Sequence, residues 1–307
     1  MEALRDAVST QLVHLGKKIK NLVVIDCDMA KHTRVSSFFT AFPDRSYQAG
    51  ICEQNAMSIA AGIASCGDIP VVSTFSAFVG TRAWEQVRHS VAYNDANVKI
   101  FATHGGFTAG EDGGSHQCLE DFALMTVIPN MVVLAPADPE EAKQAITFAV
   151  EYKGPVYLRV GREPVESIMP ENYKFELGMP VCLSDGDEIA IISTGEITQE
   201  AIKAKEVLKD YSLNAKVIHI PCIKPLNFST LISLVGDCKY IITVEEHSVF
   251  GGLGSIVANN LIGKVSVSKF KSIGTVEFGE SGKSDELRAK HGIDYKGIIK
   301  TVLEIRY

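Results

Sequence analysis

Several common sequence features are missing from this chain of 307 residues, and each absence narrows its function. The sequence contains no run of 18 apolar residues, which is about the length needed to span a membrane. Residues 1–21 also lack the apolar stretch of a signal peptide. There is no strongly basic block, and the net charge of -7 gives no reason to expect a nucleic-acid partner. We therefore expect a cytoplasmic protein that binds neither a membrane nor nucleic acid.

The cysteines form no recognisable site. There are 7 of them, an odd number, at scattered positions and without a CxxC pair. This is untypical of a disulfide framework or a zinc site, so we expect reduced thiols.

The composition is that of a globular protein with enough hydrophobic residues to form a core. The chain has 46% hydrophobic and 22% charged residues, and it is long enough for two domains.

Short apolar runs alternate with helical stretches in the first half of the chain. Helices are expected near residues 2–20, 53–66, 80–94 and 138–152. The apolar runs are hydrophobic on both faces, as in a parallel sheet covered by helices, and predict strands at 22–26, 70–75, 98–104, 131–136 and 155–160. The alternation predicts an α/β domain over residues 1–165.

The pattern lapses over residues 166–187, which contain two prolines and predict a linker. It then resumes as a second, smaller α/β domain over residues 188–307. Strands are expected at 188–194, 215–220, 240–246 and 265–270, and helices near 196–211, near 227–235, after Gly251 and twice at the end. The predicted fold class is thus α/β, with two domains that are each a mostly parallel sheet flanked by helices.

The loop after the predicted strand 98–104 is unusual. The sequence HGGFTAGEDGGSHQ, residues 104–117, holds five glycines, two acids and two histidines. Ligands bind at the carboxyl ends of parallel strands, and glycine lets the backbone approach a ligand closely. The composition favours a binding site, and the alternative is a flexible acidic surface loop.

Three other features have both a structural and a functional interpretation. Glu53 begins an apolar helical stretch, either as a favourable first-turn acid or as a buried acid with a chemical role. Phe75 and Phe78 follow a strand, either as core residues or as a wall against a flat heterocycle. The GGLG turn at 251–254 follows a strand and opens a helix but departs from G-x-G-x-x-G, so it is weak evidence for a dinucleotide site.

Taken together, these stretches resemble the C-terminal half of transketolases. GICEQNAMSIAAG, STFSAF, HGGFTAGEDGGSHQCLED, LRVGRE, IKPL and VEEHSVFGGLGS occur in the order found in that family. The resemblance covers nearly the whole chain, from a pyrimidine-binding domain to the transketolase C-terminal domain. It implies a transferase of the pentose phosphate pathway that uses thiamine diphosphate to move a two-carbon ketol unit between sugar phosphates.

The resemblance assigns roles to individual residues. Glu53 would hydrogen-bond N1′ of the cofactor's aminopyrimidine, in an apolar setting that helps it hold a proton. Cofactor contacts are also implied for the aromatic pair and for an acid in a nearby loop, namely Phe75, Phe78 and Asp28. The sugar would be contacted by Asp112 and by two histidines that also move protons, His104 and His116. The sugar phosphate would be bound by Arg162, with weaker candidates in Arg5 and Thr33.

The resemblance also implies a partner. Transketolases bind the metal and diphosphate through a G-D-G motif and a following Asn in their N-terminal half, and this chain contains no G-D-G. Some transketolases are split into two subunits, and this chain is similar to the second. We expect an N-terminal subunit that binds Mg²⁺ or Ca²⁺ and shares the cofactor, no metal on this chain, homodimerisation, and an α2β2 heterotetramer that is active only when assembled.

Three alternatives remain at this point. 1-Deoxyxylulose-5-phosphate synthase has a similar glutamate motif but is usually one long chain. The beta subunit of 2-oxo acid dehydrogenases is a separate chain with this domain order, but GEDGGSHQ favours a sugar-binding enzyme. A non-catalytic regulatory homologue would be expected to have lost some of the residues named above.

Overall fold

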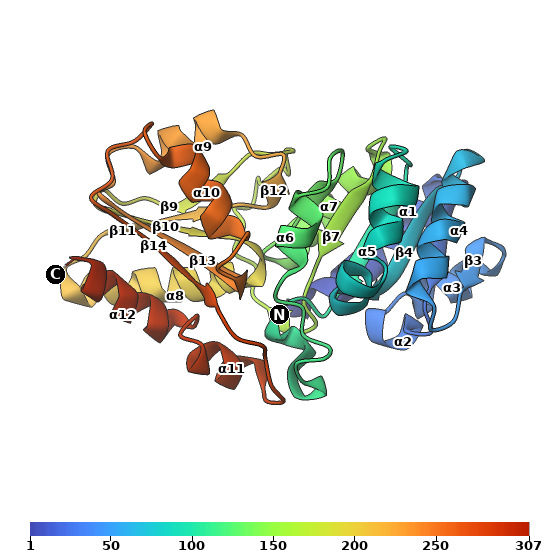
Figure 1. The fold of residues 1–307 in the computed structure, drawn as a ribbon, viewed down its shortest axis with the longest axis horizontal. Coiled ribbons are helices and arrows are strands. Elements are labelled where there is room, and N and C mark those ends of the chain that lie inside the picture. Colours follow the sequence, from blue (N-terminus) through green and yellow to red (C-terminus); the bar gives the residue numbers. More distant parts are fainter. Residues whose placement is uncertain (307) are drawn as a thin grey trace.

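The computed structural model describes residues 1–306 as two lobes joined side by side. Figure 1 shows the first lobe in blue to green and the second in yellow to red, with the N-terminus near their junction and the C-terminus at the far end of the second. Among these residues, no helix has both the length and the apolar content to cross a membrane.

The first lobe is built on a seven-stranded sheet. Its strands run, in spatial order, β12 (Cys222–Lys224), β6 (Val132–Leu134), β7 (Val156–Arg159), β5 (Lys99–Thr103), β4 (Ile69–Phe75), β2 (Leu22–Asp26) and β3 (Ser46–Gln48). All neighbouring strands are parallel except β12, which pairs antiparallel with β6. The five predicted strands of this domain are confirmed, with the same bounds for β2 and with ends that differ by at most two residues for the others.

Helices cover both faces of this sheet, as its continuous apolar strands require. One face packs against α1 (Leu4–Lys18), α3 (Ser36–Ala41) and α7 (Pro139–Glu151). The other packs against α4 (Glu53–Ser65), the helical segment 78–92 and α6 (Asp121–Thr126). The segment 78–92 contains α5 (Trp84–Gln86) between two stretches of π-helix. Helix α7 begins as predicted, because the Asp138 side chain accepts a hydrogen bond from the Glu141 backbone N–H.

The second lobe has a five-stranded sheet. The order is β14 (Lys269–Thr275), β13 (Tyr240–Ser248), β10 (Ile189–Ser193), β11 (Ala215–His219) and β9 (Val181–Ser184). Only β9 is antiparallel to its neighbour. One face is covered by α8 (Thr198–Leu208) and α12 (Tyr295–Arg306), the other by α9 (Phe228–Val235) and α10 (Leu253–Leu261). Strand β1 (Glu2–Ala3) pairs with the short strand β8 (Pro164–Val165). Two further short helices are α2 (Ala30–Thr33) and α11 (Ser284–Lys290), and short 3₁₀ turns occur at 43–45, 107–112, 195–197 and 209–211.

Two features of the second half depart from the sequence pattern. Strand β9 lies within the stretch expected to be a linker. The strand expected at 265–270 was placed too early, because β14 begins only at Lys269, where it comes into register with Tyr240 of β13. The alternating Val and Ser before it suggested a strand, but Val265 and Val267 pack against the core from the preceding loop.

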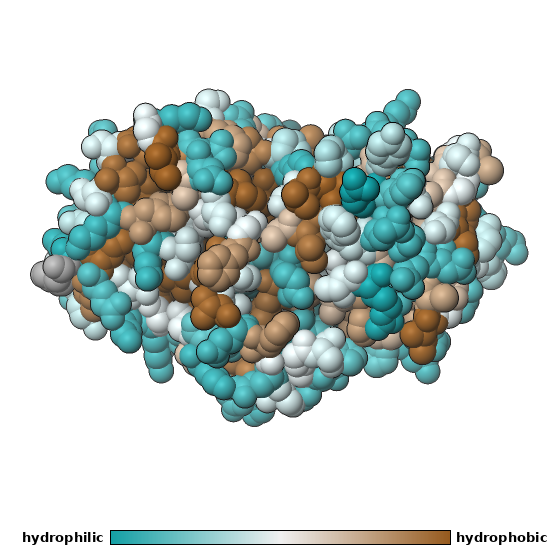
Figure 2. Space-filling model, in the orientation of Figure 1, coloured by the Kyte–Doolittle hydropathy of each residue, from teal (hydrophilic) through white to brown (hydrophobic). Residues whose placement is uncertain are grey.

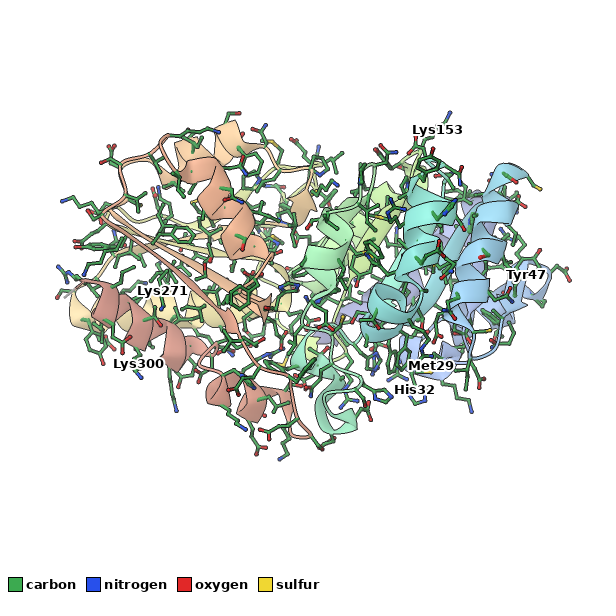
Figure 3. The ribbon with its side chains drawn as sticks, in the orientation of Figure 1. Met29, His32, Tyr47, Lys153, Lys271 and Lys300 are labelled. Carbon is green, nitrogen blue, oxygen red and sulfur yellow. The ribbon has the colours of Figure 1, made fainter. Side chains whose placement is uncertain are left out.

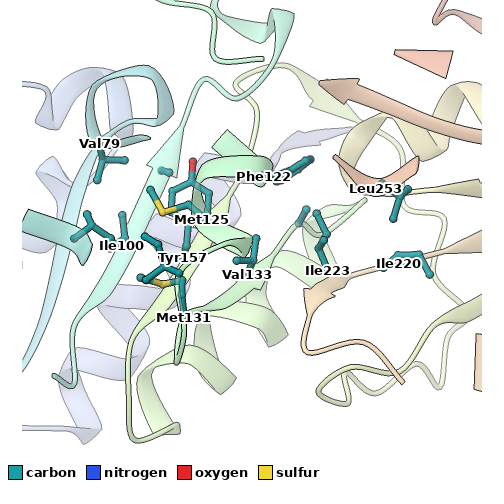
Figure 4. Packing of buried hydrophobic residues seen from close by; sticks show 14 of the residues in the cluster. Val79, Ile100, Phe122, Met125, Met131, Val133, Tyr157, Ile220, Ile223 and Leu253 are labelled. Carbon is teal, nitrogen blue, oxygen red and sulfur yellow. The ribbon is translucent and has the colours of Figure 1, made fainter. Parts of the chain in front are cut away.

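The two lobes share one hydrophobic core. Strand β12 comes from the second half of the sequence yet completes the sheet of the first lobe. Figure 4 shows the buried cluster running from Ile100 and Tyr157 through Phe122 to Ile223 and Leu253. On the face drawn in Figure 2, hydrophobic residues gather around α9 and α10 and along the junction of the lobes, among mostly polar neighbours. The continuous core fixes how the second lobe sits against the loops of the first.

Candidate active site

The carboxyl ends of β2, β4 and β5 lie next to one another, and the candidate residues follow these ends. Asp28 comes just after β2, Phe75 ends β4, and His104 comes just after β5. Neighbouring parallel strands deliver their following residues to one edge of the sheet, where open α/β sheets bind ligands. The sequence-predicted residues therefore meet at the expected edge.

An aromatic and histidine cluster forms the centre of the site. The rings of Phe75 and Phe78 are stacked, with centroids 5.5 Å apart and planes 11° apart. His104 stacks on Phe75 with centroids 3.7 Å apart, and His116 meets Phe78 edge-on at 5.3 Å. Phe75 is buried and Phe78 is partly exposed, so the pair presents one ring to the outside and packs the other against the protein.

Glu53 is buried, with 1% of its surface exposed, at the start of α4. The burial expected from the sequence is therefore present. The apolar setting is not, because Nη1 of Arg82 lies 2.9 Å from Glu53 Oε2 and donates a hydrogen bond to it. The guanidinium of Arg82 also lies 4.5 Å from the centroid of the Phe78 ring. Glu53 thus sits beside the aromatic pair with a cation as its partner.

His104 is held in a single orientation. Its Nδ1 lies 2.8 Å from Thr103 Oγ1, and Arg5 Nη1 donates to its Nε2 across 3.1 Å. The arginine can only donate, so Nε2 accepts and the ring carries its proton on Nδ1. Burial, reinforced by the charge of Arg5, lowers the pKa of His104 to about 2. The ring is therefore neutral. The backbone of His104 has a positive φ of 58°, and the burial and hydrogen bonds of the side chain hold the residue in this strained conformation.

Basic groups surround this histidine. Arg5 also donates to the backbone carbonyl of His32 across 2.9 Å. Burial lowers the pKa of Arg5, and Arg34 and Arg162 lower it further, so the three guanidinium groups share one region. Figure 3 shows His32 projecting from α2 at the lower edge of the first lobe. Arg34 is itself paired with Asp6 across 3.0 Å, so Arg5 and Arg162 are the guanidinium groups suited to an anionic ligand.

Two other predicted phosphate contacts are engaged within the protein. Thr33 is fully buried, and its hydroxyl donates to the Met29 carbonyl across 3.2 Å. Arg162 lies between two acids, 3.6 Å from Asp112 Oδ2 and 3.9 Å from Glu111 Oε2. These ion pairs are long and partly exposed, so they hold Arg162 only weakly.

Asp28 lies on the rim of the site. It is exposed and has a positive φ of 63°, and its backbone N–H donates to Gln48 Oε1 across 2.9 Å. The neighbouring Asp26 is buried and accepts from Gln48 Nε2 across 2.8 Å. Burial raises the pKa of Asp26. Of the two acids in the sequence IDCDM, Asp26 therefore holds the loop together, and Asp28 stays available on its surface.

The second lobe braces the loop 104–117. The Phe107 backbone N–H donates to Glu246 Oε1 across 3.2 Å, and its carbonyl accepts from the Ser284 hydroxyl at 3.1 Å. Gln117 Nε2 donates to the carbonyl of Glu280 at 2.8 Å, and the Ser281 hydroxyl donates to the carbonyl of Glu111 at 2.8 Å. The loop that carries Asp112 and His116 is thus bonded to the other domain at both ends.

The GGLG turn forms a closed helix start with no room for a phosphate. Glu245 accepts hydrogen bonds from the backbone N–H groups of Leu253 and Gly254 at 2.7 and 2.9 Å. Its carboxylate occupies the N-terminus of α10, where an anionic ligand would otherwise bind. His247 is buried and stacks on Phe122 with centroids 5.3 Å apart. Both features are structural, which agrees with the low weight given to a dinucleotide site.

Three residues at the site were not predicted from the sequence. Arg82 resembles any exposed charge on a helix, and only its contact with Glu53 distinguishes it. His32 follows the IDCDM stretch, and its ring lies 6.4 Å from the Phe75 ring. Glu246 belongs to VEEHSVFGGLGS, but nothing in that stretch indicates contact with a loop 139 residues away.

Two protein-family models each match one half of the chain. A family model described as "Transketolase, pyrimidine binding domain" matches residues 2–166, and "Transketolase, C-terminal domain" matches residues 180–298. The first covers the lobe that holds Glu53 and the aromatic pair, and the second covers the lobe that braces the loop.

Similar proteins match along the full length of the chain. A protein of Methanocaldococcus jannaschii, named "Putative transketolase C-terminal section", is 44% identical over 99% of this chain and 96% of its own length. A "6-deoxy-6-sulfo-D-fructose transketolase subunit" of a Clostridium species is 34% identical over 98% and 94%. A solved structure described as "Split gene transketolase, inactive beta4 tetramer" is 36% identical over 99% and 98%, with a TM-score of 0.91.

Proposed function

The chain belongs to the transketolase family, and we propose that it is the C-terminal subunit of a split transketolase that transfers a two-carbon ketol unit between sugar phosphates with thiamine diphosphate. The observation that carries this proposal is the convergence of a buried carboxylate, a stacked phenylalanine pair and two histidines at the carboxyl edge of a parallel sheet. The relatives matched over nearly their full length support a separate C-terminal subunit.

The residues present fit the aminopyrimidine half of thiamine diphosphate. The stacked pair Phe75 and Phe78 offers a flat apolar surface to a heterocycle. Glu53 places a buried carboxylate within reach of the same surface, since Arg82 contacts both. When bound, the cofactor supplies the electron sink for breaking and forming the carbon–carbon bond of the sugar.

Each residue then has a task toward the cofactor. Glu53 holds a proton on N1′ of the aminopyrimidine, which requires a carboxyl group shielded from water. Phe75 and Phe78 orient the ring and exclude water from it. Asp28, exposed on the rim, is placed to contact the cofactor from the β2 side.

In this proposal the sugar lies between the loop 104–117 and the guanidinium groups of Arg5 and Arg162. His104 is neutral and is held by Arg5 and Thr103, so it positions a hydroxyl group of the sugar rather than taking up its proton. His116, which contacts the edge of the Phe78 ring, acts beside the same aromatic pair, and Asp112 accepts from the hydroxyl groups. Arg162 and Arg5 bind the phosphate, and Thr33 supports α2 beside them.

The partner completes the site. We propose that an N-terminal subunit binds the diphosphate and a Mg²⁺ or Ca²⁺ ion, and that two copies of each chain form a cytoplasmic α2β2 heterotetramer. The inactive tetramer named for a similar protein supports the need for a second type of subunit. The isolated chain is expected to have no ketol-transfer activity, and mixing it with the N-terminal subunit is expected to restore it.

The substitution Glu53→Gln tests the assignment in the reconstituted complex. Glutamine keeps the shape but cannot supply an acidic proton, so kcat should fall by about 10²–10⁴-fold, the usual loss for a positioned acid or base. Stability should change by less than about 1 kcal/mol, because the Arg82 charge left behind is partly exposed to solvent. Both quantities are measured on one preparation, by turnover and by thermal unfolding.

The matched control is Glu85→Gln, which removes an exposed carboxylate from the neighbouring helix. It should change neither kcat nor Tm. A normal kcat for Glu53→Gln would show that Glu53 is only a first-turn acid.

The choice of donor separates ketol transfer from the synthase alternative. A "1-deoxy-D-xylulose-5-phosphate synthase" of Dehalococcoides mccartyi is 36% identical over 92% of this chain, but the match covers only 44% of that protein's length. A ketose phosphate donor is therefore assayed beside pyruvate with glyceraldehyde 3-phosphate. If only the ketose phosphate serves as donor, the transketolase assignment is supported. If only pyruvate serves as donor, the synthase assignment is supported.

A further inference from the structure

Arg82 makes an unusual contact for a residue on an exposed helix. Its side chain is 44% exposed, yet it is hydrogen-bonded to a carboxylate that is 1% exposed. The guanidinium bridges from the partly exposed ring of Phe78 to Glu53 Oε2, at 4.5 Å from the ring centroid and 2.9 Å from the oxygen. It therefore closes the outer side of the aromatic and carboxylate cluster.

These two contacts are the ones that the cofactor needs. The proposed function places a flat nitrogen-containing ring on the phenylalanine pair and one of its nitrogens on Glu53. A guanidinium is also planar, carries N–H donors at its edge, and stacks on aromatic rings. The aminopyrimidine and the Arg82 side chain cannot occupy the same ring face and the same carboxylate oxygen together.

On the basis of the function proposed above, we infer that Arg82 is a surrogate ligand that fills the aminopyrimidine site of the unassembled subunit and is displaced when the cofactor binds. Without a ligand, a buried Glu53 carboxylate would have no partner, which is unfavourable. Arg82 removes that penalty. Because nearly half of its side chain is exposed to solvent, it can swing outward without any change of the backbone.

The consequence is a reduced affinity of the free chain for its cofactor. Binding must first break the Arg82–Glu53 ion pair, so the apparent dissociation constant rises as the fraction of molecules with a free site falls. A charged hydrogen bond of this kind corresponds to about a ten- to hundredfold change. Premature binding of cofactor to a chain without its partner is thereby discouraged.

The test uses the isolated full chain and thiamine, which carries the aminopyrimidine but no diphosphate. The chain has a single tryptophan, Trp84, two residues from Arg82, and its indole N–H donates to the Leu124 carbonyl at 2.8 Å. Its fluorescence is a local readout that needs no catalysis. Arg82→Ala should bind thiamine about ten- to a hundredfold more tightly than the unmodified chain, and Arg88→Ala, an exposed arginine on the same helical segment, should bind like the unmodified chain.

A second measurement covers the case in which Arg82→Ala is poorly folded. Arg82→Lys keeps the charge but loses the planar group, and it should show an intermediate gain in affinity. In thermal unfolding, Arg82→Ala should lower Tm in the unmodified chain and much less when combined with Glu53→Gln, because the carboxylate that needs a partner is then gone.

Thiamine binding by Arg82→Ala that is unchanged or weaker would overturn the inference and make Arg82 a structural or cofactor-holding residue. An equal drop in Tm with and without Glu53→Gln would do the same. Ketol transfer in the reconstituted complex is measured separately. If the unmodified complex shows no ketol transfer, the proposed function is rejected. If it shows ketol transfer but Arg82→Ala binds thiamine like the unmodified chain, only the role of Arg82 is rejected.

Discussion

Replacing Glu196 by glutamine should stabilise the protein in alkaline solution. Glu196 lies between the lobes, where one carboxylate oxygen accepts from the Gly161 backbone N–H at 2.9 Å. The other oxygen is buried and has no hydrogen-bond partner among residues 1–306. Burial raises the pKa of Glu196 to about 8, opposed by Arg288 and reinforced by Glu246.

The direction of the pH dependence follows from this pKa. In the unfolded chain the carboxyl loses its proton near the ordinary glutamate pKa of 4.5, but in the folded protein it keeps the proton up to about pH 8. The folded state therefore binds more protons than the unfolded state in this window, so stability falls as pH rises from about 4.5 to 8. Each pKa unit corresponds to about 1.4 kcal/mol, which sets an upper limit of about 5 kcal/mol on the loss.

Glutamine cannot ionise, so it escapes this loss and still offers an oxygen to Gly161. Its amide N–H₂ takes the place of the partnerless oxygen, and an unsatisfied buried donor costs about 1–3 kcal/mol. The net gain for Glu196→Gln is then at most about 2–4 kcal/mol at pH 9, and it becomes a small net loss at pH 5, where the glutamate is protonated in the fold and the cost of the amide remains.

Urea unfolding at pH 5, 7 and 9 measures this difference. The control is Glu206→Gln, an exposed acid on α8, which should give a curve parallel to that of the unmodified protein. If the unfolding free energies of Glu196→Gln and the unmodified protein change with pH in parallel, Glu196 is ionised in the fold and the reasoning is wrong.

Two further changes test the sugar site and the second lobe. Arg162→Ala should raise KM for phosphorylated sugars about ten- to a hundredfold more than for unphosphorylated ones, the range for a lost charged hydrogen bond, and equal losses in steady-state assays would exclude phosphate binding by Arg162. Gly252→Ala should lower Tm, because the added Cβ would lie 2.0 Å from Glu245 Oε2 and push the carboxylate off the start of α10. Gly62→Ala, where a Cβ meets nothing within 4 Å, is the matched control, and an unchanged Tm for Gly252→Ala would contradict the assignment of the turn.

Sequence periodicity was sufficient for the long elements of the first lobe and for the edge of the sheet that holds the site, but not for β9 or for the start of β14. The apolar runs identified β2, β4 and β5, and the rule for parallel strands then brought Phe75 and His104 together. Pairing between distant segments was not predictable in this way. Strand β12 joins the first sheet from position 222, which depends on how the lobes pack rather than on any local pattern.

The surroundings of Glu53 show the same limit at the level of one side chain. The apolar residues of α4 correctly indicated burial, since Ala56, Met57 and Ala60 line the core. The partner of the carboxylate comes from a helical segment that follows the next strand, and a lone arginine on an exposed face carries no local signal of that contact. Burial could be predicted from composition, whereas electrostatic pairing required the fold.

The second lobe holds the loop 104–117 in one conformation, which the glycine-rich sequence of the loop does not favour by itself. Five glycines give the loop 104–117 a large conformational entropy, and three of them, Gly106, Gly110 and Gly113, adopt a positive φ that other residues rarely accept. The same composition permits the close contacts that fix the loop, since a Cβ on Gly114 would lie 2.4 Å from the Gly279 carbonyl oxygen. The glycines therefore allow close packing but leave the loop without rigidity of its own. Hydrogen bonds with Glu246, Ser284 and residues 280–281 of the second lobe supply that rigidity. A domain without any candidate catalytic residue is thus required for the geometry of Asp112 and His116.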